Sequence, residues 1–288
     1  GSGEWLLIHD MSEYWAHVVE KGREAFAESE YRVSNRSVDT PAVEEPAGLE
    51  TEAAGRLGRP ASLIGSFGYG AYSNDLELAV ATAMRARQTR DWRVWDDKSM
   101  ARMLAYVEQF KVPTPSRAQA PWVPVGRIVE KDFRERGALE LHVQVDADHA
   151  GDLQSRKSTT GYLIILIGRY GTRVVLDGKA KLQPGVAVST AEAEVTAISM
   201  AARRLLGVLS MYEVLFGPLK VLIHTDATAA LGAVKRGMSK SMGYMKRKGH
   251  AVSLAWLHEQ VADWLYKIST TVNGADILTK PLDPESFW

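Results

Sequence analysis

The sequence predicts an α/β fold in its C-terminal half, a mixed five-stranded sheet with flanking helices, preceded by a smaller and mainly helical region. Three observations predict it. The stretch "LELHVQVD" (139–146) alternates apolar and polar residues, as a half-buried strand does. Further segments follow in the order strand, strand, helix, strand, helix, strand, helix, which is typical of an α/β layout. A proline-rich stretch, "VPTPSRAQAPWVPVG", separates this pattern from the helical periodicity before it.

The first 112 residues are predicted to form the helical region. "YWAHVVEKGREAF" carries the amphipathic period and predicts a helix over about 4–35. Residues 36–60 are acidic and contain prolines, so we expect a loop there. Two more helices, over 76–88 and 99–110, are expected to pack on each other. The chain therefore divides into a helical region (1–112), a proline-rich linker (113–138) and an α/β domain (139–288).

The elements of the α/β domain follow in order. After the first strand, "GYLIILIG" and "TRVVLDG" predict two more strands, and a long helix is expected from Ser189 to about Leu215. "LKVLIHTD" predicts a strand and "ATAALGAV" a short helix. "ADWLYKIS" predicts the last strand, and "NGADILTK" opens a last helix.

Composition limits the possible functions. Lys+Arg 35 against Asp+Glu 35 gives no net charge in 288 residues, so a nucleic-acid partner must be argued from local patches. The chain has no cysteine, which excludes disulfides and thiolate metal sites. No apolar run is long enough to span a bilayer and no signal peptide is visible, so we expect no membrane partner and an intracellular location, in a cytoplasmic particle or the nucleus. The first residues, "GSGEWLL", suggest a fragment of a longer polypeptide or a tag remnant.

Two glutamates in "STAEAEV" (189–195) have different predicted roles. Glu192 follows Ser189 by three residues, which is the spacing of a capping box, and lies on the face of the helix that we expect to be solvated, with Thr196, Ser199 and Arg203. Glu194 lies instead on the stripe that should pack against the sheet. Its companions at helical spacing are Ile198, Ala201, Leu205 and Val208. A carboxylate on an apolar stripe is costly to bury unless it is paired or binds a metal.

Three aspartates are candidate partners of Glu194. Asp146 and Asp226 each end a predicted strand, and Asp276 lies near the start of the last helix. Taken singly, each has a structural explanation in turn chemistry or helix-terminus stabilisation. Taken together, the four carboxylates could converge at one edge of a sheet, where an all-oxygen cluster suits Mg²⁺ or Mn²⁺. Two such ions about 4 Å apart clamp the attacking and leaving oxygens of a phosphodiester.

Four motifs carry a family resemblance. "VDADHAGDLQSRKSTTGYLIIL", "VSTAEAEVTAIS", "IHTDATAAL" and "ADILTKPL" occur in this order over about 139–282. In order and spacing they resemble the ribonuclease H domain of copia-type retrotransposon reverse transcriptases. The upstream segments are similar, more weakly, to the connection between the polymerase and ribonuclease H in those Pol polyproteins. The paired-aspartate motif of the polymerase is absent, so DNA synthesis is not expected.

The resemblance implies a ribonuclease H-like fold, a function and a site. Asp146, Glu194, Asp226 and Asp276 match the acidic quartet of the family, which implies metal-dependent endonucleolytic hydrolysis of the RNA strand of an RNA–DNA hybrid, with two Mg²⁺ or Mn²⁺ ions. The implied partners are the hybrid and the polymerase portion of the same polyprotein, without a small-molecule cofactor. There are departures: Ala255 stands near an expected aromatic or histidine position, and "VLDGKAKLQ" replaces a tryptophan-containing strand.

Basic residues are candidates for binding nucleic acid. The stretch "KRGMSKSMGYMKRKGH" follows the third acidic motif, and "SRK" follows the first. Such contacts would follow phosphates rather than base sequence; the alternative is a solvated loop. The histidines show no zinc spacing and are given no metal role. The candidate residues are Arg156, Lys157, Lys235, Arg236, Lys240, Lys246, Arg247 and Lys248.

Two other functions stay open at this point. The chain could be a catalytically inactive nucleic-acid-binding scaffold of a truncated polyprotein, which Mg²⁺-dependent cleavage would exclude. It could also be a DNA-cutting nuclease or integrase of the same fold. An integrase-like site usually has three carboxylates, so a requirement for Asp276 would count against that alternative.

The basic stretch predicts salt-sensitive hybrid binding, because each phosphate contact releases counterions. Replacing Lys246, Arg247 and Lys248 together by neutral residues should flatten the slope of log affinity against log salt concentration. A titration of hybrid binding across a salt series checks this. An unchanged slope would mean that the stretch is a solvated loop.

Overall fold

The computed structural model describes residues 3–29, 37–46, 48, 51–73, 75–113, 124–242 and 252–287. The chain forms two compact units. One contains 1–7 and 124–280, and the other contains 8–123 and 281–288. None of the helices in the described part of the chain has the length and apolar character needed to cross a bilayer.

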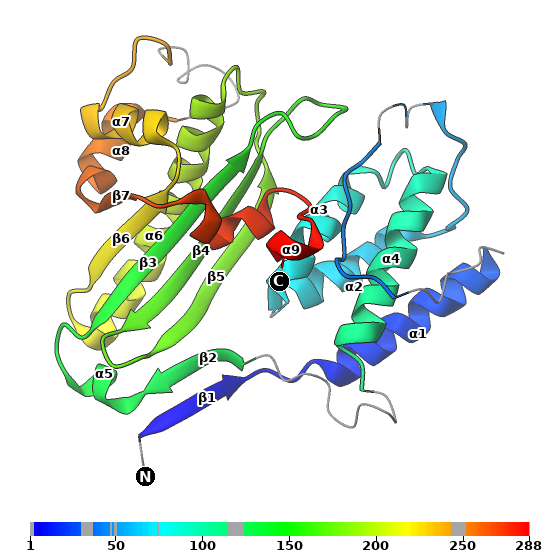
Figure 1. Cartoon of the computed structure of the whole chain (residues 1–288), viewed down its shortest axis with the longest axis horizontal. Helices are drawn as coiled ribbons and strands as arrows, with labels where there is room; N and C mark the ends of the chain where they lie inside the picture. Colours follow the sequence, from blue (N-terminus) through cyan, green and yellow to red (C-terminus); the bar gives the residue numbers. More distant parts are fainter. Residues whose placement is uncertain are drawn as a thin grey trace. The chain divides into compact units, whose positions relative to one another are not determined.

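The first unit is built on a mixed sheet, which confirms the predicted fold class (Figure 1). The strands, in spatial order, are β1 (Glu4–Ile8), β2 (Pro124–Val129), β5 (Arg173–Leu182), β4 (Thr159–Gly168), β3 (Leu139–Asp148), β6 (Lys220–Thr225) and β7 (Leu265–Lys267). β2, β5, β4 and β3 pair antiparallel in turn, whereas β3, β6 and β7 run parallel. The five predicted strands are adjacent, and β1 and β2 extend the sheet to seven in the described residues.

The long helix α6 (Thr190–Phe216) lies along one face of this sheet (Figure 1). The alternation predicted for β3 holds: Leu141, Val143 and Val145 are fully buried in the core shared with α6. α7 (Thr228–Arg236) and α8 (Leu254–Val261) pack against each other and against α6. No helix was predicted at α8, whose start is capped by the Ser253 hydroxyl accepting from the Trp256 N–H.

A C-terminal segment crosses the opposite face of the sheet near the end of β3 (Figure 1). It contains the short 3₁₀ helices η4 (Thr270–Val272) and η5 (Gly274–Leu278). The Asn273 side-chain amide donates to the Val145 carbonyl at 3.0 Å and ties this segment to β3. Gly161 of β4, the register partner of Asp146, lets η5 approach: a Cβ there would lie 2.7 Å from the Ala275 carbonyl oxygen.

Two predictions for the ends of the elements need correction. The helix expected from residue 4 is α1 (Ser12–Glu28), because the Asp10 carboxylate accepts from the Ser12 N–H at the helix start and the preceding "EWLLI" forms β1. The second half of the predicted linker is ordered: 124–129 form β2, which pairs with β5, and α5 (Glu130–Arg134) follows. The proline at the start of β2 is compatible with a strand, since the first strand position tolerates a missing donor. Residues 114–123 of the linker lie outside the described residues.

The last two predicted elements are shorter than expected. In "ADWLYKIS" the first residues form the 3₁₀ helix η3 (Ala262–Trp264), and only β7 is extended. The last helix predicted from "NGADILTK" is the 3₁₀ turn η5. Asn273 caps this turn with its side-chain oxygen, accepting from the Ala275 N–H.

The second unit is mainly helical, as predicted. It contains α1, α2 (Pro60–Ser73), η2 (Leu76–Leu78), α3 (Ala79–Arg87), α4 (Val94–Phe110) and the short α9 (Pro284–Phe287). α3 and α4 contact each other, as the two apolar periods indicated. The largest fully buried side chains of its core include Trp15, Phe26, Phe67, Met100 and Tyr106.

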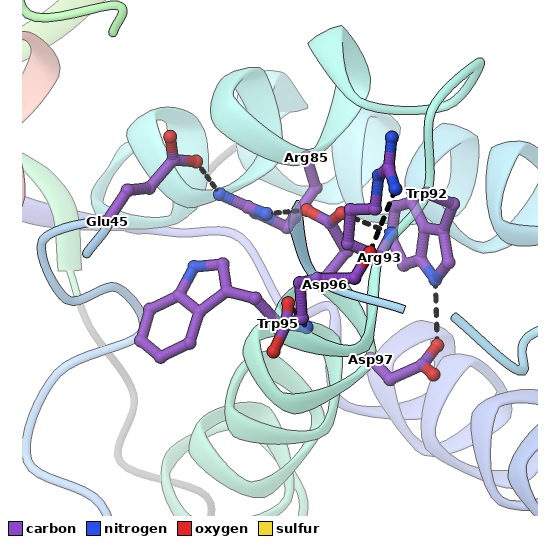
Figure 2. Close-up of polar contacts among 8 residues, drawn as sticks. Glu45, Arg85, Trp92, Arg93, Trp95, Asp96 and Asp97 are labelled. Atoms are coloured by element: carbon purple, nitrogen blue, oxygen red, sulfur yellow. Dashed lines mark hydrogen bonds and ion pairs between the residues drawn. The ribbon is translucent and has the colours of Figure 1, made fainter. Parts of the chain in front are cut away.

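A buried arginine joins the elements of this unit (Figure 2). The Arg85 guanidinium, from α3, donates to the carboxylates of Glu45 and Asp96. Asp96 also accepts from the Arg93 N–H at 2.7 Å, and so stabilises the start of α4. Because a buried charge without a partner is strongly destabilising, this network holds the loop that carries Glu45 against α3 and α4.

The close approach of η5 to Gly161 predicts that alanine substitutions at Gly161 and at Gly207 have opposite effects on stability. Gly161→Ala should destabilise the fold by about 1–3 kcal/mol, since the new methyl group overlaps the η5 backbone. Gly207→Ala in α6 meets open space and should stabilise by up to about 1 kcal/mol. Chemical denaturation of both variants checks this. Equal stabilities would show that η5 does not pack on β4 as described.

Candidate metal centre

Three of the four predicted carboxylates converge. Asp146 lies near the end of β3, Glu194 in the first turns of α6, and Asp226 directly after β6. One oxygen from each lies within 4.8 Å of the others. Within the described residues, this is the one group of acidic or histidine side chains with the spacing to hold a metal ion.

Strand pairing accounts for two of these positions. β3 and β6 are parallel neighbours in a register that pairs Gln144 with His224. Asp146 and Asp226 each follow two residues later, so both carboxylates emerge at the same edge of the sheet. The carboxyl ends of parallel strands meet at one edge, and ligands commonly bind there in α/β proteins.

The helical phase of α6 accounts for the position of the third carboxylate, Glu194. The stripe predicted for α6 is buried along its length: Glu194, Ile198, Ala201, Leu205 and Val208 are each at most 7% exposed. Glu194 is only 4% exposed, and its carboxylate lies close to Asp146 of β3, which confirms that it faces the sheet.

Glu192 acts at the helix start, although its expected exposure was wrong. The Ser189 hydroxyl accepts from the Glu192 N–H at 3.2 Å, and the Glu192 carboxylate accepts from the Val188 N–H at 2.8 Å. Glu192, Thr196 and Ser199 are buried, whereas Arg203 is exposed. The expected solvated face begins only in the second half of α6, because α7 and α8 pack against the helix.

Asp276 lies outside this triad but close to it. Its Oδ2 forms an ion pair with the Lys280 ammonium at 3.3 Å, and its Oδ1 is buried without a hydrogen-bond partner among the described residues. Thr279, three residues after Asp276, donates its hydroxyl to Asp146. The structure thus places Asp276 beside the triad on η5, with one oxygen already paired to a cation.

Two of the carboxylates have raised pKa values, chiefly because they are buried. Burial, opposed by the Thr279 hydrogen bond and reinforced by the charges of Asp276 and Asp226, raises the pKa of Asp146 to about 6. Burial and the charges of Asp146 and Asp226 raise the pKa of Glu194 to about 9. Like charges in a poorly solvated site cannot all ionise at neutral pH without a compensating cation.

The donor set fits a hard divalent cation. All ligand atoms are carboxylate oxygens, which Mg²⁺ and Mn²⁺ prefer. Glu194 Oε2 is buried and has no hydrogen-bond partner among the described residues, so this oxygen is available for an ion. Asp146, Glu194 and Asp226 could therefore hold one ion.

The predicted basic residues fall into three groups. Arg156 and Lys157 lie in the turn between β3 and β4, where Arg156 has a left-handed backbone (φ 57°) and an exposed side chain. Lys235 and Arg236 end α7, and Lys240 follows that helix; all three are exposed, as phosphate contacts require. The predicted contacts of Lys246, Arg247 and Lys248 lie outside the described residues.

Three residues that touch the acidic group were missed in the sequence analysis. Thr270 donates its hydroxyl to Asp226 Oδ2 at 2.6 Å, and Thr279 donates to Asp146. Lys280 pairs with Asp276 from four residues away. That i,i+4 spacing of opposite charges was a readable signal for Lys280, whereas the two threonine contacts depend on how the C-terminal segment folds back.

The raised pKa values predict an unusual pH dependence of the ion-free protein. Between about pH 5 and pH 9 the folded state binds more protons than the unfolded state, so the free energy of unfolding should fall as pH rises. Glu194→Gln should remove most of this slope and leave the ion-free protein as stable or more stable. Thermal melting with a chelator across this pH range checks both statements; a melting temperature that rises with pH in the wild type contradicts them.

Sequence comparison relates the chain to two proteins. It is 33% identical over 147 residues to the retrovirus-related Pol polyprotein from transposon TNT 1-94 of Nicotiana tabacum, a match that covers 49% of this chain and 10% of the polyprotein. It is 40% identical over 70 residues to the secreted RxLR effector protein 161 of Plasmopara viticola, over 24% of this chain and 46% of that protein. No protein-family profile matches. The chain is thus similar to a small part of a transposon Pol polyprotein.

Proposed function

We propose that the chain hydrolyses the RNA strand of RNA–DNA hybrids, endonucleolytically and with two Mg²⁺ or Mn²⁺ ions, as part of a retrotransposon Pol polyprotein. The convergence of Asp146, Glu194 and Asp226 at one edge of a mixed sheet carries this proposal. The similarity to a Pol polyprotein supports the polyprotein context. The polymerase portion of that polyprotein and the hybrid are the partners that this function requires.

The roles of the residues follow from their positions. Asp146, Glu194 and Asp226 would hold one ion between them, and Asp146 with Asp276 would hold the other. Bound divalent ions supply activation of a water and stabilisation of the leaving 3′ oxygen. Thr279 and Thr270 orient Asp146 and Asp226 through their hydroxyl groups. The exposed basic residues beside the sheet edge would contact phosphates of the substrate.

A DNA-cutting nuclease is the second candidate, and one observation favours it. Three carboxylates form the close group, whereas Asp276 is engaged by Lys280. A site that needs only the triad is the arrangement expected for that alternative. Asp276→Asn separates the two: it should abolish hybrid cleavage if the fourth carboxylate is required, and should spare activity in a triad nuclease.

The experiment is a cleavage assay with labelled RNA–DNA hybrid and, in parallel, duplex DNA, with and without Mg²⁺. Glu194→Gln should lower hybrid cleavage by about a hundredfold or more, the scale of losing a preorganised charge at a reacting group. Glu192→Gln should leave cleavage nearly intact, because a glutamine oxygen can still accept from the Val188 N–H.

The outcomes discriminate between the candidates. Glu194-dependent cleavage of the hybrid, and not of duplex DNA, supports the proposal. Preferential cutting of duplex DNA favours the second candidate. Binding of the hybrid without any Mg²⁺-dependent cleavage would identify an inactive scaffold. Loss of activity in Glu192→Gln but not in Glu194→Gln would show that the glutamates have been assigned the wrong roles.

A further inference from the structure

Lys280 places a positive charge at the edge of the acidic group. Its ammonium lies 3.3 Å from Asp276 Oδ2, and its side chain is 43% exposed. Burial alone would lower the pKa of Lys280, but the charges of Asp276 and Asp146 and the hydrogen bond to Asp276 raise it overall. The lysine is therefore a cation in the field of the carboxylates that the proposed function assigns to metal binding.

The position of Lys280 is set by the backbone around it. The N–H groups of Thr279 and Lys280 both lie near the Asp276 carbonyl, at 3.1 and 3.5 Å, so the chain turns tightly after η5. Thr279 is buried, and its hydroxyl donates to Asp146. The Thr279 hydrogen bond holds Lys280 beside Asp276, so the ion pair is fixed by the local backbone.

The two oxygens of Asp276 are in different situations. Oδ2 is paired with Lys280, whereas Oδ1 is buried without a hydrogen-bond partner among the described residues. A carboxylate with one buried and unmatched oxygen has capacity for a further cation. A divalent ion bound at Oδ1 would lie close to the Lys280 ammonium. The two positive charges would repel each other.

We propose that Lys280 is a positioning residue that competes with a divalent cation for Asp276 and so weakens ion binding at this carboxylate in the substrate-free protein. The inference rests on the proposed function, since it assumes that the carboxylates bind divalent ions. It adds that the ion at Asp276 binds more weakly than the ion at the triad because the chain carries its own counter-cation there.

Direct Mn²⁺ binding to the substrate-free chain tests this, by isothermal titration calorimetry or by the electron paramagnetic resonance signal of free Mn²⁺. Lys280→Met should bind Mn²⁺ about fivefold more tightly or gain a second measurable ion, since a nearby positive charge is removed. Lys280→Arg keeps the charge and should remain close to the wild type.

Lys220→Met is the matched control. Lys220 forms a 2.9 Å ion pair with Glu140 at the opposite end of β6, roughly 20 Å from Asp226 at strand rise. This variant removes the same charge and also breaks a lysine–carboxylate pair. Screening over that distance should leave Mn²⁺ affinity unchanged.

The failures of the two proposals are distinguishable. If the wild type binds Mn²⁺ in a Glu194-dependent way but Lys280→Met binds with unchanged or weaker affinity, the competition is disproved and the proposed metal centre stands. If Mn²⁺ binding does not depend on Glu194, the metal centre and the competition both fall. If Lys220→Met raised the Mn²⁺ affinity by the same factor, the effect would come from net charge alone. That result would overturn the role of Lys280.

Discussion

The burial of the Glu194 carboxylate on the sheet-facing side of α6 is the constraint on which the C-terminal unit depends. The helix cannot rotate to expose this group, because the same stripe of α6 buries Ile198, Ala201 and Leu205 in the core. The apolar stripe therefore holds in place a carboxyl group whose ionisation is costly because of its burial, and the charges of Asp146 and Asp226 beside it make the ionised form costlier still. A bound cation, as the proposed function assigns to this site, would offset that cost.

The sheet supplies the other half of this arrangement. A parallel pairing of β3 with β6 brings two strand ends to one edge, and the antiparallel β4 contributes a glycine opposite Asp146. The missing side chain at Gly161 gives η5 access to the sheet, and η5 brings Asp276, Thr279 and Lys280 to the acidic group. Gly161 therefore matters both for packing and for the site. Without a side chain at this position, the C-terminal segment can approach the carboxylates.

The stability of the ion-free fold and the proposed ion binding make opposite demands on this edge. Without an ion, the protein tolerates the repulsion by keeping Glu194 protonated near neutral pH, by hydrogen bonds from Thr270 and Thr279, and by the ammonium of Lys280. Of these, the proton on Glu194 and the Lys280 ammonium would compete with the proposed cation, whereas the threonine hydroxyls hold Asp226 and Asp146 in place. Binding of an ion to the folded state alone would reverse the balance and stabilise the unit.

The sequence by itself determined the alternation of β3 and the burial of the Glu194 stripe of α6, because these follow from local periodicity, and motif spacing selected the three carboxylates that the structure brings together. It did not determine the burial of Glu192 and Ser199, the ordering of 124–129 as β2, or the 3₁₀ turn at Gly274–Leu278. Only the tertiary structure decided that Asp146, Glu194 and Asp226 form the close group and that Asp276 stands outside it. The physical reason is that strand pairing, the packing of α7 and α8 on α6 and the approach of η5 to Gly161 are contacts between residues distant in the chain, which no local pattern encodes.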